Sequence, residues 1–365
     1  MTDATIPPDF SNVISDEHIP TSTSVSDSVS GPVAPAPGGV PTPTTAGVTP
    51  RPTLPVGHLV GRYRIDALLG QGAWSTVYRV TDTSLNLPVV LKVLSPMASP
   101  TVVERFKNEI LFSRRVNHPG FCRIFELHEQ QTTEGPLRSL TMELIEGRTL
   151  GDVMNEGPMP PARALDIARS LCDVIAAAHE QGVVHGDLKP GNVMVRTPSS
   201  RRRRERRGEA RDDLVVLDFG AATARDLNVG GGRVGSLRYM APELFAQEAP
   251  SPQSDVWAIG VILYGCLTGG YPFEGRTELE LASATRRPPS PPSSVRPALP
   301  AHLDTLVLSA LAPERAARYA DCRAFAAGID ACLEGLRPAR GFWQQLRAFL
   351  QRPVAVCDDD ATMGS

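Results

Sequence analysis

The sequence lacks a long uninterrupted hydrophobic run, and it lacks an excess of charge of either sign. The longest apolar stretch, residues 256–267, falls short of the ~18 to 20 residues that a transmembrane helix needs and is typical of a buried core helix. With 37 Lys and Arg residues against 40 Asp and Glu residues, the formal net charge is -3, so no overall field favours nucleic acid or anionic membranes. The N-terminal residues also lack a basic leader followed by an apolar block. We therefore expect a soluble, cytoplasmic protein.

Cysteine is scarce, and no pair of cysteines has the Cys-x-x-Cys spacing of zinc sites and redox motifs. Most cysteines lie inside apolar helical patterns such as "ARSLCDVIAAAH". The cysteines are Cys122, Cys172, Cys266, Cys322, Cys332 and Cys357. This distribution indicates reduced, buried thiols in a cytoplasmic protein and argues against a cysteine metal site.

Proline, serine, threonine and small residues dominate the start of the chain, residues 1–57, which has no helical or strand periodicity. Such a composition buries too little surface to offset the backbone entropy, so we expect a disordered tail there. The remaining chain is long enough and hydrophobic enough for one large domain, which we expect over residues 58–335. Residues 336–365 should form a C-terminal amphipathic helix and tail, with Phe342, Trp343 and Leu346 on one helical face.

The domain should consist of a small β-rich part and a larger helical part. Alternating β-branched runs predict strands, and apolar residues spaced three or four apart predict helices. We expect strands over residues 63–69, 75–80, 89–94, 122–129 and 138–145, and helices over residues 102–116, 161–182, 255–270, 302–313 and 321–336. The fold class is therefore α+β, with a small antiparallel sheet and one main helix over about residues 58–146 and a mostly α-helical lobe over about residues 147–335. The Pro-rich residues 286–300 should be a rigid surface connector.

Two features of the β-rich part are compatible with phosphate binding. Gly70 and Gly72 lie in a turn between two predicted strands, where glycine lets backbone N–H groups approach a phosphate closely, although such a turn is more often only a turn. Lys92 interrupts the apolar strand "VVLKVL", and a charge there is costly unless it is paired. Glu109, on the predicted helix 102–116, is a candidate partner. From the spacing alone, two surface charges that never meet remain an equal alternative.

The stretch "VVHGDLKPGN", residues 183–192, gathers several polar residues on a short loop before the apolar strand "VMV". Asp187 and Asn192 come from this loop, and the later strand "LVVLDFG" delivers Asp218. Oxygen-bearing side chains at neighbouring strand ends suit Mg²⁺, which takes few protein ligands and keeps its other positions for water and phosphate. Asp187 would then be free to receive a hydroxyl proton.

These motifs, followed by "GSLRYMAPE" and "DVWAIGVILYG", occur in an order that resembles the eukaryotic-type protein kinases, and specifically the bacterial serine/threonine kinases, over most of the predicted domain. The resemblance implies a bilobal fold and an ATP-dependent kinase that uses ATP and Mg²⁺ and phosphorylates Ser and Thr hydroxyls of protein substrates. It makes Asp187 the catalytic base and Lys189 a contact of the transferring phosphoryl group. It also makes Asn192 and Asp218 the Mg²⁺ ligands.

The same resemblance implies the nucleotide site. Lys92, paired to Glu109, would hold the α- and β-phosphates, and Met142 would border the adenine pocket. The backbone of Glu143 and Ile145 would hydrogen-bond the base. The implied nucleotide-binding residues are Leu69, Gly70, Gln71, Gly72, Ala73, Val77, Val90, Lys92, Met142, Glu143, Ile145 and Met194.

Structural roles follow from the resemblance as well. Glu243 and Arg318 would form a buried ion pair in the larger lobe, and Asp255 would anchor the catalytic loop. Two departures from the family pattern fall in the smaller lobe. Ser75 replaces the third glycine of the turn, with little expected loss, and Ser113 replaces an aliphatic residue, which should weaken the stacking between the lobes.

A third departure is Gly186, which stands where many members carry an arginine that receives a phosphate on the activation loop. Without a guanidinium group, a phosphorylated loop has no charged partner at this position. Between residues 220 and 241 the hydroxyl groups are limited to Thr223, Ser236 and Tyr239. We therefore predict an enzyme whose activity does not require activation-loop phosphorylation.

Two other functions remain open from the sequence. A nucleotide-binding pseudokinase scaffold is disfavoured because the residues expected to carry catalysis are all present. A small-molecule kinase is suggested by "HGDL", which occurs in such enzymes, but "GSLRYMAPE" resembles the peptide-positioning segment that they lack.

The basic insertion at residues 197–213 contains "RRRRERR" and is expected to be a solvated loop. It lacks interleaved aromatic residues for base stacking, so nucleic acid is not the expected partner. The N-terminal tail, this insertion and the C-terminal helix are candidate docking segments for partner proteins.

Overall fold

The computed structural model describes residues 53–336, apart from residue 73 and residues 133–134, 198–211 and 219–233. The predictions for most of the N-terminal tail, for Ala73 and Thr223, for most of the basic insertion and for the C-terminal helix and tail fall outside the described residues.

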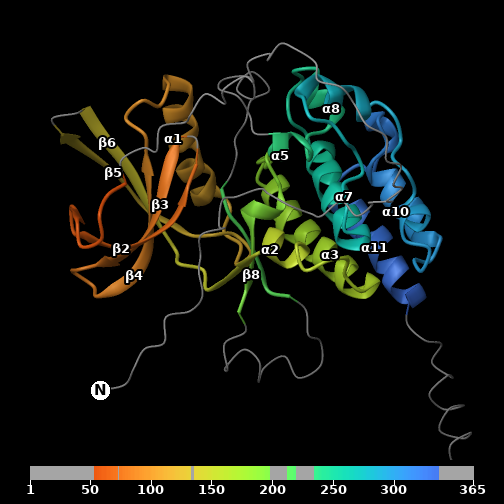
Figure 1. Ribbon diagram of the computed structural model, residues 1–365, viewed down its shortest axis with the longest axis horizontal. Helices are drawn as coiled ribbons and strands as arrows, with labels where there is room; N and C mark the ends of the chain where they lie inside the picture. The colour runs from red at the N-terminus through yellow and green to blue at the C-terminus, as the bar shows by residue number, and fades with distance from the viewer. Residues whose placement is uncertain (1–52, 73, 133–134, 198–211, 219–233, 337–365) are drawn as a thin grey trace, which may run out of the picture.

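The N-terminal lobe is built on one antiparallel sheet with the strand order β1-β2-β3-β4-β6-β5 (Figure 1). Its elements are β1 (Leu59–Val60), β2 (Tyr63–Gln71), β3 (Ser75–Asp82), β4 (Leu87–Leu94), α1 (Pro100–Arg115), β5 (Ile124–Thr132) and β6 (Gly135–Met142). The five strands and the main helix predicted for this part of the chain are therefore confirmed. Asn86, with φ of 52°, makes the tight turn between β3 and β4, because asparagine tolerates the left-handed region better than most residues.

Helix α1 begins at a residue that stops most helices. Pro100 is accommodated in the first turn, where its missing N–H is not needed, and the Ser99 hydroxyl accepts a hydrogen bond from the backbone N–H of Val102. Val102 and Phe106 are buried and pack into a cluster with Leu94 of β4 and Leu140 of β6. This contact fixes α1 beside the sheet and determines where its polar residues lie.

The C-terminal lobe is mostly helical and lies beside the sheet lobe (Figure 1). Its helices are α2 (Leu150–Met154), α3 (Pro161–His179), α5 (Val234–Leu237), α6 (Pro242–Phe245), α7 (Pro252–Thr268), α8 (Glu278–Ala284), α9 (Pro292–Val295), α10 (His302–Ala310) and α11 (Cys322–Leu336), with 3-10 turns η1 (Pro190–Asn192) and η3 (Arg315–Ala317). A small sheet of order β7-β8-β9 contains β7 (Gly147–Thr149), β8 (Val193–Arg196) and β9 (Leu214–Val216). The predicted α+β bilobal fold is confirmed.

Helix α7 is the central element of this lobe. It is buried all round, as expected for a helix that carries apolar residues on every face, and it packs against α3 and α10. It ends at Gly269, which adopts the left-handed conformation (φ 76°) that glycine allows at a helix C-terminus. The prediction that residues 255–270 form a buried core helix is confirmed.

The Pro-rich segment at residues 286–300 is not a plain surface connector. It contains the short helix α9, and Pro292 and Leu299 are buried. The Arg296 guanidinium donates hydrogen bonds to the carbonyl oxygens of Met159 and Leu267, at 2.8 and 2.9 Å. The segment is therefore bound into the lobe, because proline can start a helical turn and buried backbone carbonyls need donors.

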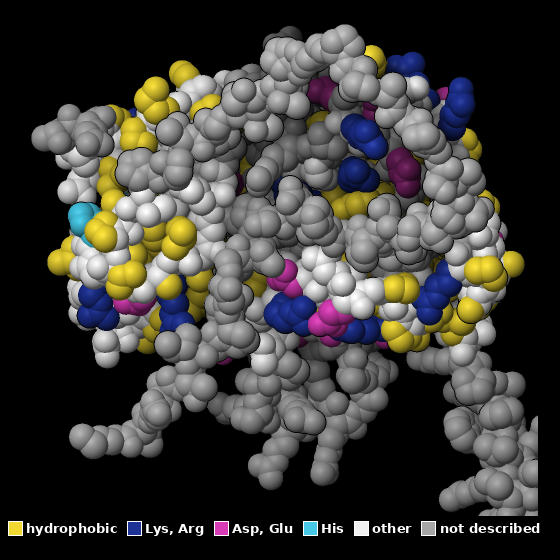
Figure 2. All heavy atoms as spheres, in the orientation of Figure 1, with side chains coloured by type: hydrophobic (Ala, Val, Ile, Leu, Met, Phe, Trp, Pro, Cys, Tyr) yellow, Lys and Arg dark blue, Asp and Glu magenta, His cyan; other side chains and the backbone are white. Residues whose placement is uncertain are grey.

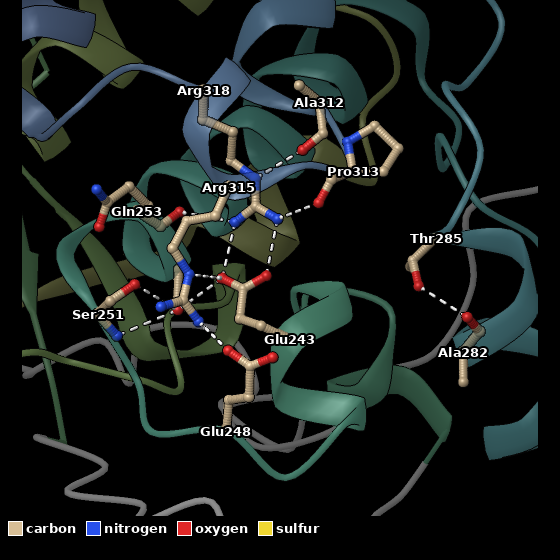
Figure 3. A network of polar contacts seen from close by, with 11 residues as sticks. Glu243, Glu248, Ser251, Gln253, Ala282, Thr285, Ala312, Pro313, Arg315 and Arg318 are labelled. Atoms are coloured by element: carbon tan, nitrogen blue, oxygen red, sulfur yellow. Dashed lines mark hydrogen bonds and ion pairs between the residues drawn. The ribbon is translucent and has the colours of Figure 1, made fainter.

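Glu243 and Arg318 form the buried ion pair that the resemblance implied, with both N···O distances at 2.7 Å (Figure 3). The remaining guanidinium donors bind the carbonyls of Ala312, Pro313 and Gln253. Burial opposes ionisation of the Glu243 carboxyl, but the hydrogen bond and charge of Arg318 outweigh it and lower the pKa of Glu243. This pair links α6 to the segment between α10 and α11.

Hydrophobic side chains gather on the exposed face of the sheet lobe, whereas charges are mixed over the helical lobe (Figure 2).

None of the helices in the described part of the chain is both long and apolar enough to span a bilayer. Cys122, Cys172, Cys266 and Cys322 are buried free thiols, and Cys332 is half-buried.

Candidate active site

Lys92 joins three elements of the fold. It lies on β4, and its Nζ is 3.0 Å from Glu109 Oε2 on α1 and 2.9 Å from Asp218 Oδ1, which follows β9. The ion pair between Lys92 and Glu109 that the sequence left open is therefore formed. One ammonium group is shared between two carboxylates from different lobes.

The charges of this cluster are strongly coupled. Burial alone would lower the pKa of Lys92, but the nearby carboxylates of Asp218 and Glu109 outweigh it and raise that pKa, so Lys92 is charged at neutral pH. Burial raises the pKa of Glu109 to about 7 against the attraction of Lys92, and the Asp218 carboxylate adds to the rise. For Asp218, burial is outweighed by the Lys92 charge and hydrogen bond, so its pKa is lowered. A single lysine cannot neutralise both carboxylates.

The loop that carries Asp187 is held by one buried carboxylate. Asp255, on α7, accepts hydrogen bonds from the backbone N–H groups of His185 and Gly186, both at 2.9 Å. His179 Nε2, at the end of α3, lies 2.8 Å from the same carboxylate. Burial opposes the charged imidazole, but the hydrogen bond and charge of Asp255 raise the pKa of His179 to about 10. The anchoring role expected for Asp255 is thus visible in its contacts.

Gly186 has φ of 74°, in the left-handed region that most residues avoid. The backbone turns here so that consecutive N–H groups face Asp255. Glycine at this position therefore has a conformational reason in addition to the lost guanidinium that the sequence indicated.

The polar residues of the loop converge with a residue from α5. Lys189 Nζ lies 3.3 Å from Asp187 Oδ2 and donates a hydrogen bond to Ser236 Oγ at 2.8 Å. Asn192 Nδ2 donates to the backbone carbonyl of Asp187 at 2.9 Å. Asp187, with a side chain about one third exposed (36%), thus combines a fixed backbone with access to solvent.

Asn192 and Asp218 fit a hard cation such as Mg²⁺. The amide of Asn192 is oriented by its donor contact to Asp187, which leaves its Oδ1 as a ligand, and Asp218 has a second carboxylate oxygen beyond the one that faces Lys92. Asp218 has φ of 44°, an unusual value for aspartate. Strain of this kind is maintained where the surrounding structure fixes a functional side chain.

The residues expected around adenine come together at the junction of the lobes. Val90, Met142, Ile145 and Met194 belong to one buried cluster, and Leu69 and Val77 pack against it. The backbone N–H of Glu143 donates to the Arg123 carbonyl at 2.9 Å, and its carbonyl accepts a hydrogen bond from the Cys122 thiol at 3.7 Å and keeps a second lone pair for a base. Neither the N–H nor the C=O of Ile145 makes a backbone hydrogen bond with another described residue.

Of the two glycines predicted to lie in the turn, Gly70 belongs to the end of β2 and only Gly72 lies in the turn that follows, because β2 continues to Gln71 by pairing with β3. Gly70 lies opposite Val77 and Gln71 opposite Thr76 across the β2–β3 pair. The Gly72 N–H donates to the Ser75 carbonyl at 2.8 Å, so in this conformation it closes the turn itself. Ser75, in the third glycine's position, therefore contributes a backbone acceptor to the turn.

The sequence interpretation missed two residues that support the site. His179 neutralises the charge of the Asp255 carboxylate, and Arg196 on β8 pairs with the side chain of Glu143 at 3.0 Å. Neither has a distinctive local signal, since a polar residue at the end of a helix or strand is ordinarily solvated. Their partners are far away in sequence, so only the fold brings them together.

Comparison with known proteins agrees with this geometry. The protein kinase domain model matches residues 63–320. The serine/threonine-protein kinase PknB of Mycobacterium tuberculosis is 33% identical over 271 residues, which cover 72% of this chain and 41% of that protein. The serine/threonine-protein kinase PknL of the same species is 34% identical over 285 residues, covering 76% of this chain and 67% of the relative. The chain spans about two fifths of the length of the PknB relatives that it matches.

Among solved structures, the PknI kinase domain of Mycobacterium tuberculosis superposes with a TM-score of 0.60 at 24% identity, covering 78% of this chain and 100% of that domain. This likeness supports the bilobal fold.

Proposed function

Because this chain belongs to the protein kinase family, with its similarity to bacterial serine/threonine-protein kinases, we propose that it transfers the γ-phosphoryl group of MgATP to Ser and Thr hydroxyls of protein substrates. The observation that carries the proposal is the contact of Lys92 Nζ with both Glu109 and Asp218, at 3.0 and 2.9 Å. These contacts bring β4, α1 and the segment after β9 together, next to the loop that carries Asp187 and Asn192.

Each residue has a distinct task in this proposal. Asp187 accepts the proton of the attacking hydroxyl, because its carboxylate is solvent-accessible and its backbone is fixed. Lys189 balances charge near Asp187, and Lys92 clamps the phosphates. Asn192 and Asp218 would hold Mg²⁺, which supplies neutralisation of the phosphate charge when bound. The reaction class needs positioned charges rather than a covalent intermediate, and this site supplies them.

We further propose that activity does not require phosphorylation of the activation loop. Support comes from Gly186, which offers no guanidinium to a loop phosphate, and from the direct contact of Lys189 with the unmodified hydroxyl of Ser236. Treatment of the purified chain with a phosphatase, followed by its removal, should leave the rate within about twofold, whereas loss of activity would contradict independence.

The action is proposed to take place in the cytoplasm. The four buried free cysteines suit a reducing compartment, and ATP is the required co-substrate.

The decisive experiment incubates the full chain with labelled ATP, Mg²⁺ and a generic acceptor such as casein or myelin basic protein. We expect label on Ser and Thr of the acceptor, and a rate about 10²- to 10⁴-fold lower for Asp187→Asn. The variant should still bind nucleotide, since Asp187 is not among the nucleotide-pocket residues. Nucleotide binding by the parent chain without any transfer would instead indicate a scaffold, and label on a small molecule alone would indicate a small-molecule kinase.

A further inference from the structure

Arg238 lies two residues after Ser236, next to the proposed active site. Ser236, on α5, accepts the hydrogen bond from Lys189 Nζ at 2.8 Å, which places this segment beside the catalytic loop. The guanidinium carbon of Arg238 lies 4.3 Å from the centre of the Tyr271 ring. Its side chain is half-buried, and no carboxylate of the described residues lies within ion-pair distance of it.

The absence of an acidic partner sets Arg238 apart from most other buried or partly buried arginines of this lobe. Arg169, Arg196, Arg315 and Arg318 pair with the carboxylates of Asp330, Glu143, Glu248 and Glu243, whereas Arg296 donates to two backbone carbonyls. Basic side chains also lie within a hollow on the face of the helical lobe shown in Figure 2. Among the described residues, therefore, no carboxylate neutralises Arg238, and its guanidinium can bind an acidic group of another molecule.

Two aromatic side chains pack beside Arg238 and fix the position of its guanidinium group. Tyr271, in the connection between α7 and α8, packs edge-to-face with Tyr239, with ring centres 6.1 Å apart and an interplanar angle of 76°. Tyr239 is buried, so it supports the ring of Tyr271 from the interior. A guanidinium group stacked on such a ring keeps its N–H donors directed outward from its edge. This arrangement matches the planar, two-oxygen geometry of a carboxylate or phosphate.

We propose that Arg238, supported by Tyr271, binds an acidic side chain of the protein substrate close to the Ser or Thr that is phosphorylated. The proposal rests on the proposed kinase function, because it concerns the same acceptor. The bound group is a carboxylate of Asp or Glu, or a phosphate already present on the substrate. Its effect is to select substrates, since Arg238 does not contact Lys92, Asp187 or Asp218 in any described interaction.

The test uses matched peptides with one acceptor serine. In one set a single Glu is moved through each position from three residues before the serine to three residues after it, and in the other set Gln takes its place. For the full chain with MgATP, we expect kcat/KM to be about 5- to 30-fold higher for Glu than for Gln at one or two adjacent positions. The preference should shrink as ionic strength rises, because the pair is partly exposed.

Substitutions at Arg238 and Tyr271 test whether the preference for Glu peptides depends on Arg238. Arg238→Gln should bring the Glu/Gln ratio to within about twofold, Arg238→Lys should retain part of it, and Arg238→Glu should favour a Lys-containing peptide. Tyr271→Phe keeps the aromatic face and the preference, whereas Tyr271→Leu should reduce the ratio about 2- to 5-fold. Arg276→Gln is the matched control, because Arg276 is an exposed arginine on the same α7–α8 connection, and its ratio should equal that of the parent chain. Thermal unfolding of each variant separates misfolding from altered selection.

The outcomes separate this proposal from the kinase function itself. Equal rates for Glu and Gln peptides at every position, with measurable phosphorylation of both, would overturn the role of Arg238 and leave the kinase function standing. If no peptide is phosphorylated, binding of the same fluorescent peptides to the chain loaded with a non-hydrolysable ATP analogue decides, because equal affinities again overturn the proposal. A preference that disappears after phosphatase treatment of the protein would show that Arg238 binds a phosphate of its own chain, which also contradicts the proposal.

Discussion

Residues with unusual conformations or environments are concentrated around the proposed active site. Lys92 is buried and contacts two carboxylates, Asp218 has φ of 44°, and Gly186 has φ of 74°. Each feature opposes folding on its own, and each is stabilised by contacts to other elements. The placement of strain and buried charge at one point supports the assignment of function to that point.

Gly186 offers a test of the backbone requirement. Alanine at φ of 74° should destabilise the protein by about 1 to 2 kcal/mol, because Cβ crowds the backbone in the left-handed region. Urea unfolding of Gly186→Ala measures this cost. Gly72→Ala serves as the control, since its Cβ would meet the Ser75 carbonyl at an ordinary 3.5 Å and its stability should change by less than about 0.5 kcal/mol. Equal stability of the two variants would show that Gly186 is not required for its conformation.

Arg318 tests the buried ion pair. Arg318→Ala leaves the Glu243 carboxylate buried without its partner, so we expect a loss of about 3 to 5 kcal/mol in stability and a lower folded yield before any loss of specific activity. The control is Arg148→Ala, because Arg148 and its partner Glu156 are both more than half exposed and the pair should contribute little to stability. Circular dichroism melts and activity per folded molecule give the comparison. A soluble, well-folded but inactive Arg318→Ala protein would contradict a structural role.

At the level of elements, the sequence predicted the long strands and helices because their periodicity is strong. The strands β2, β3 and β4 and the helices α3, α7 and α11 all lie where their patterns indicate. Helix α1 begins two residues before its prediction, because Pro100 was not recognised as a first-turn residue. Short elements such as β7 have no periodicity and depend on pairing with β8.

The candidate site was only partly predictable. Residue types and order identified Lys92, Asp187 and Asp218, but spacing could not decide whether Lys92 meets Glu109, since that depends on how α1 packs on the sheet. The contacts of His179 and Arg196 join residues from separate elements. No local pattern contains such information, because each partner alone resembles an ordinary surface residue.

The pair of Arg196 with Glu143 tests how β8 supports the segment between the lobes. Arg196 lies on β8, next to Thr197, whose N–H donates to the Glu146 carbonyl at 3.0 Å. Arg196→Met keeps the aliphatic stem but leaves Glu143 without its partner, so we expect KM for ATP to rise about 3- to 10-fold with kcat within about twofold. Steady-state kinetics at saturating acceptor measure both.

Glu143→Gln provides the reciprocal variant, because it removes the carboxylate and keeps the backbone carbonyl. It should raise KM less than Arg196→Met does, because the glutamine amide oxygen can still accept a hydrogen bond from the Arg196 guanidinium. A fall in kcat with unchanged KM in both variants would assign the ion pair to catalysis rather than to nucleotide binding.

At the scale of the whole molecule, the Lys92 cluster couples the two lobes electrostatically. The sheet supplies the ammonium group, α1 supplies Glu109, and the helical lobe supplies Asp218. The cluster carries one positive and two negative groups when all are ionised, and this excess negative charge suits a site that would receive a divalent cation. Without the cation, the excess should reduce stability.

The expected consequence is a pH-dependent stability that involves Glu109. Burial raises its pKa from 4.5 to about 7, so between these values the folded chain holds a proton that the unfolded chain has released. The free energy of unfolding contributed by this group must then fall as pH rises from about 4.5 to about 7, by about 1 to 3 kcal/mol. Glu109→Gln removes this term, because glutamine does not titrate.

Urea unfolding without nucleotide at pH values from 5 to 8 tests this expectation. Glu109→Gln should become more stable relative to the parent chain as pH rises, even though it breaks an ion pair of the proposed active site. Glu104→Gln, which changes an exposed carboxylate on the same helix, should keep the pH dependence of the parent chain. A stability difference for Glu109→Gln that is constant or falls with pH would show that Lys92 fully compensates Glu109, and the cluster would then not be strained in the absence of the cation.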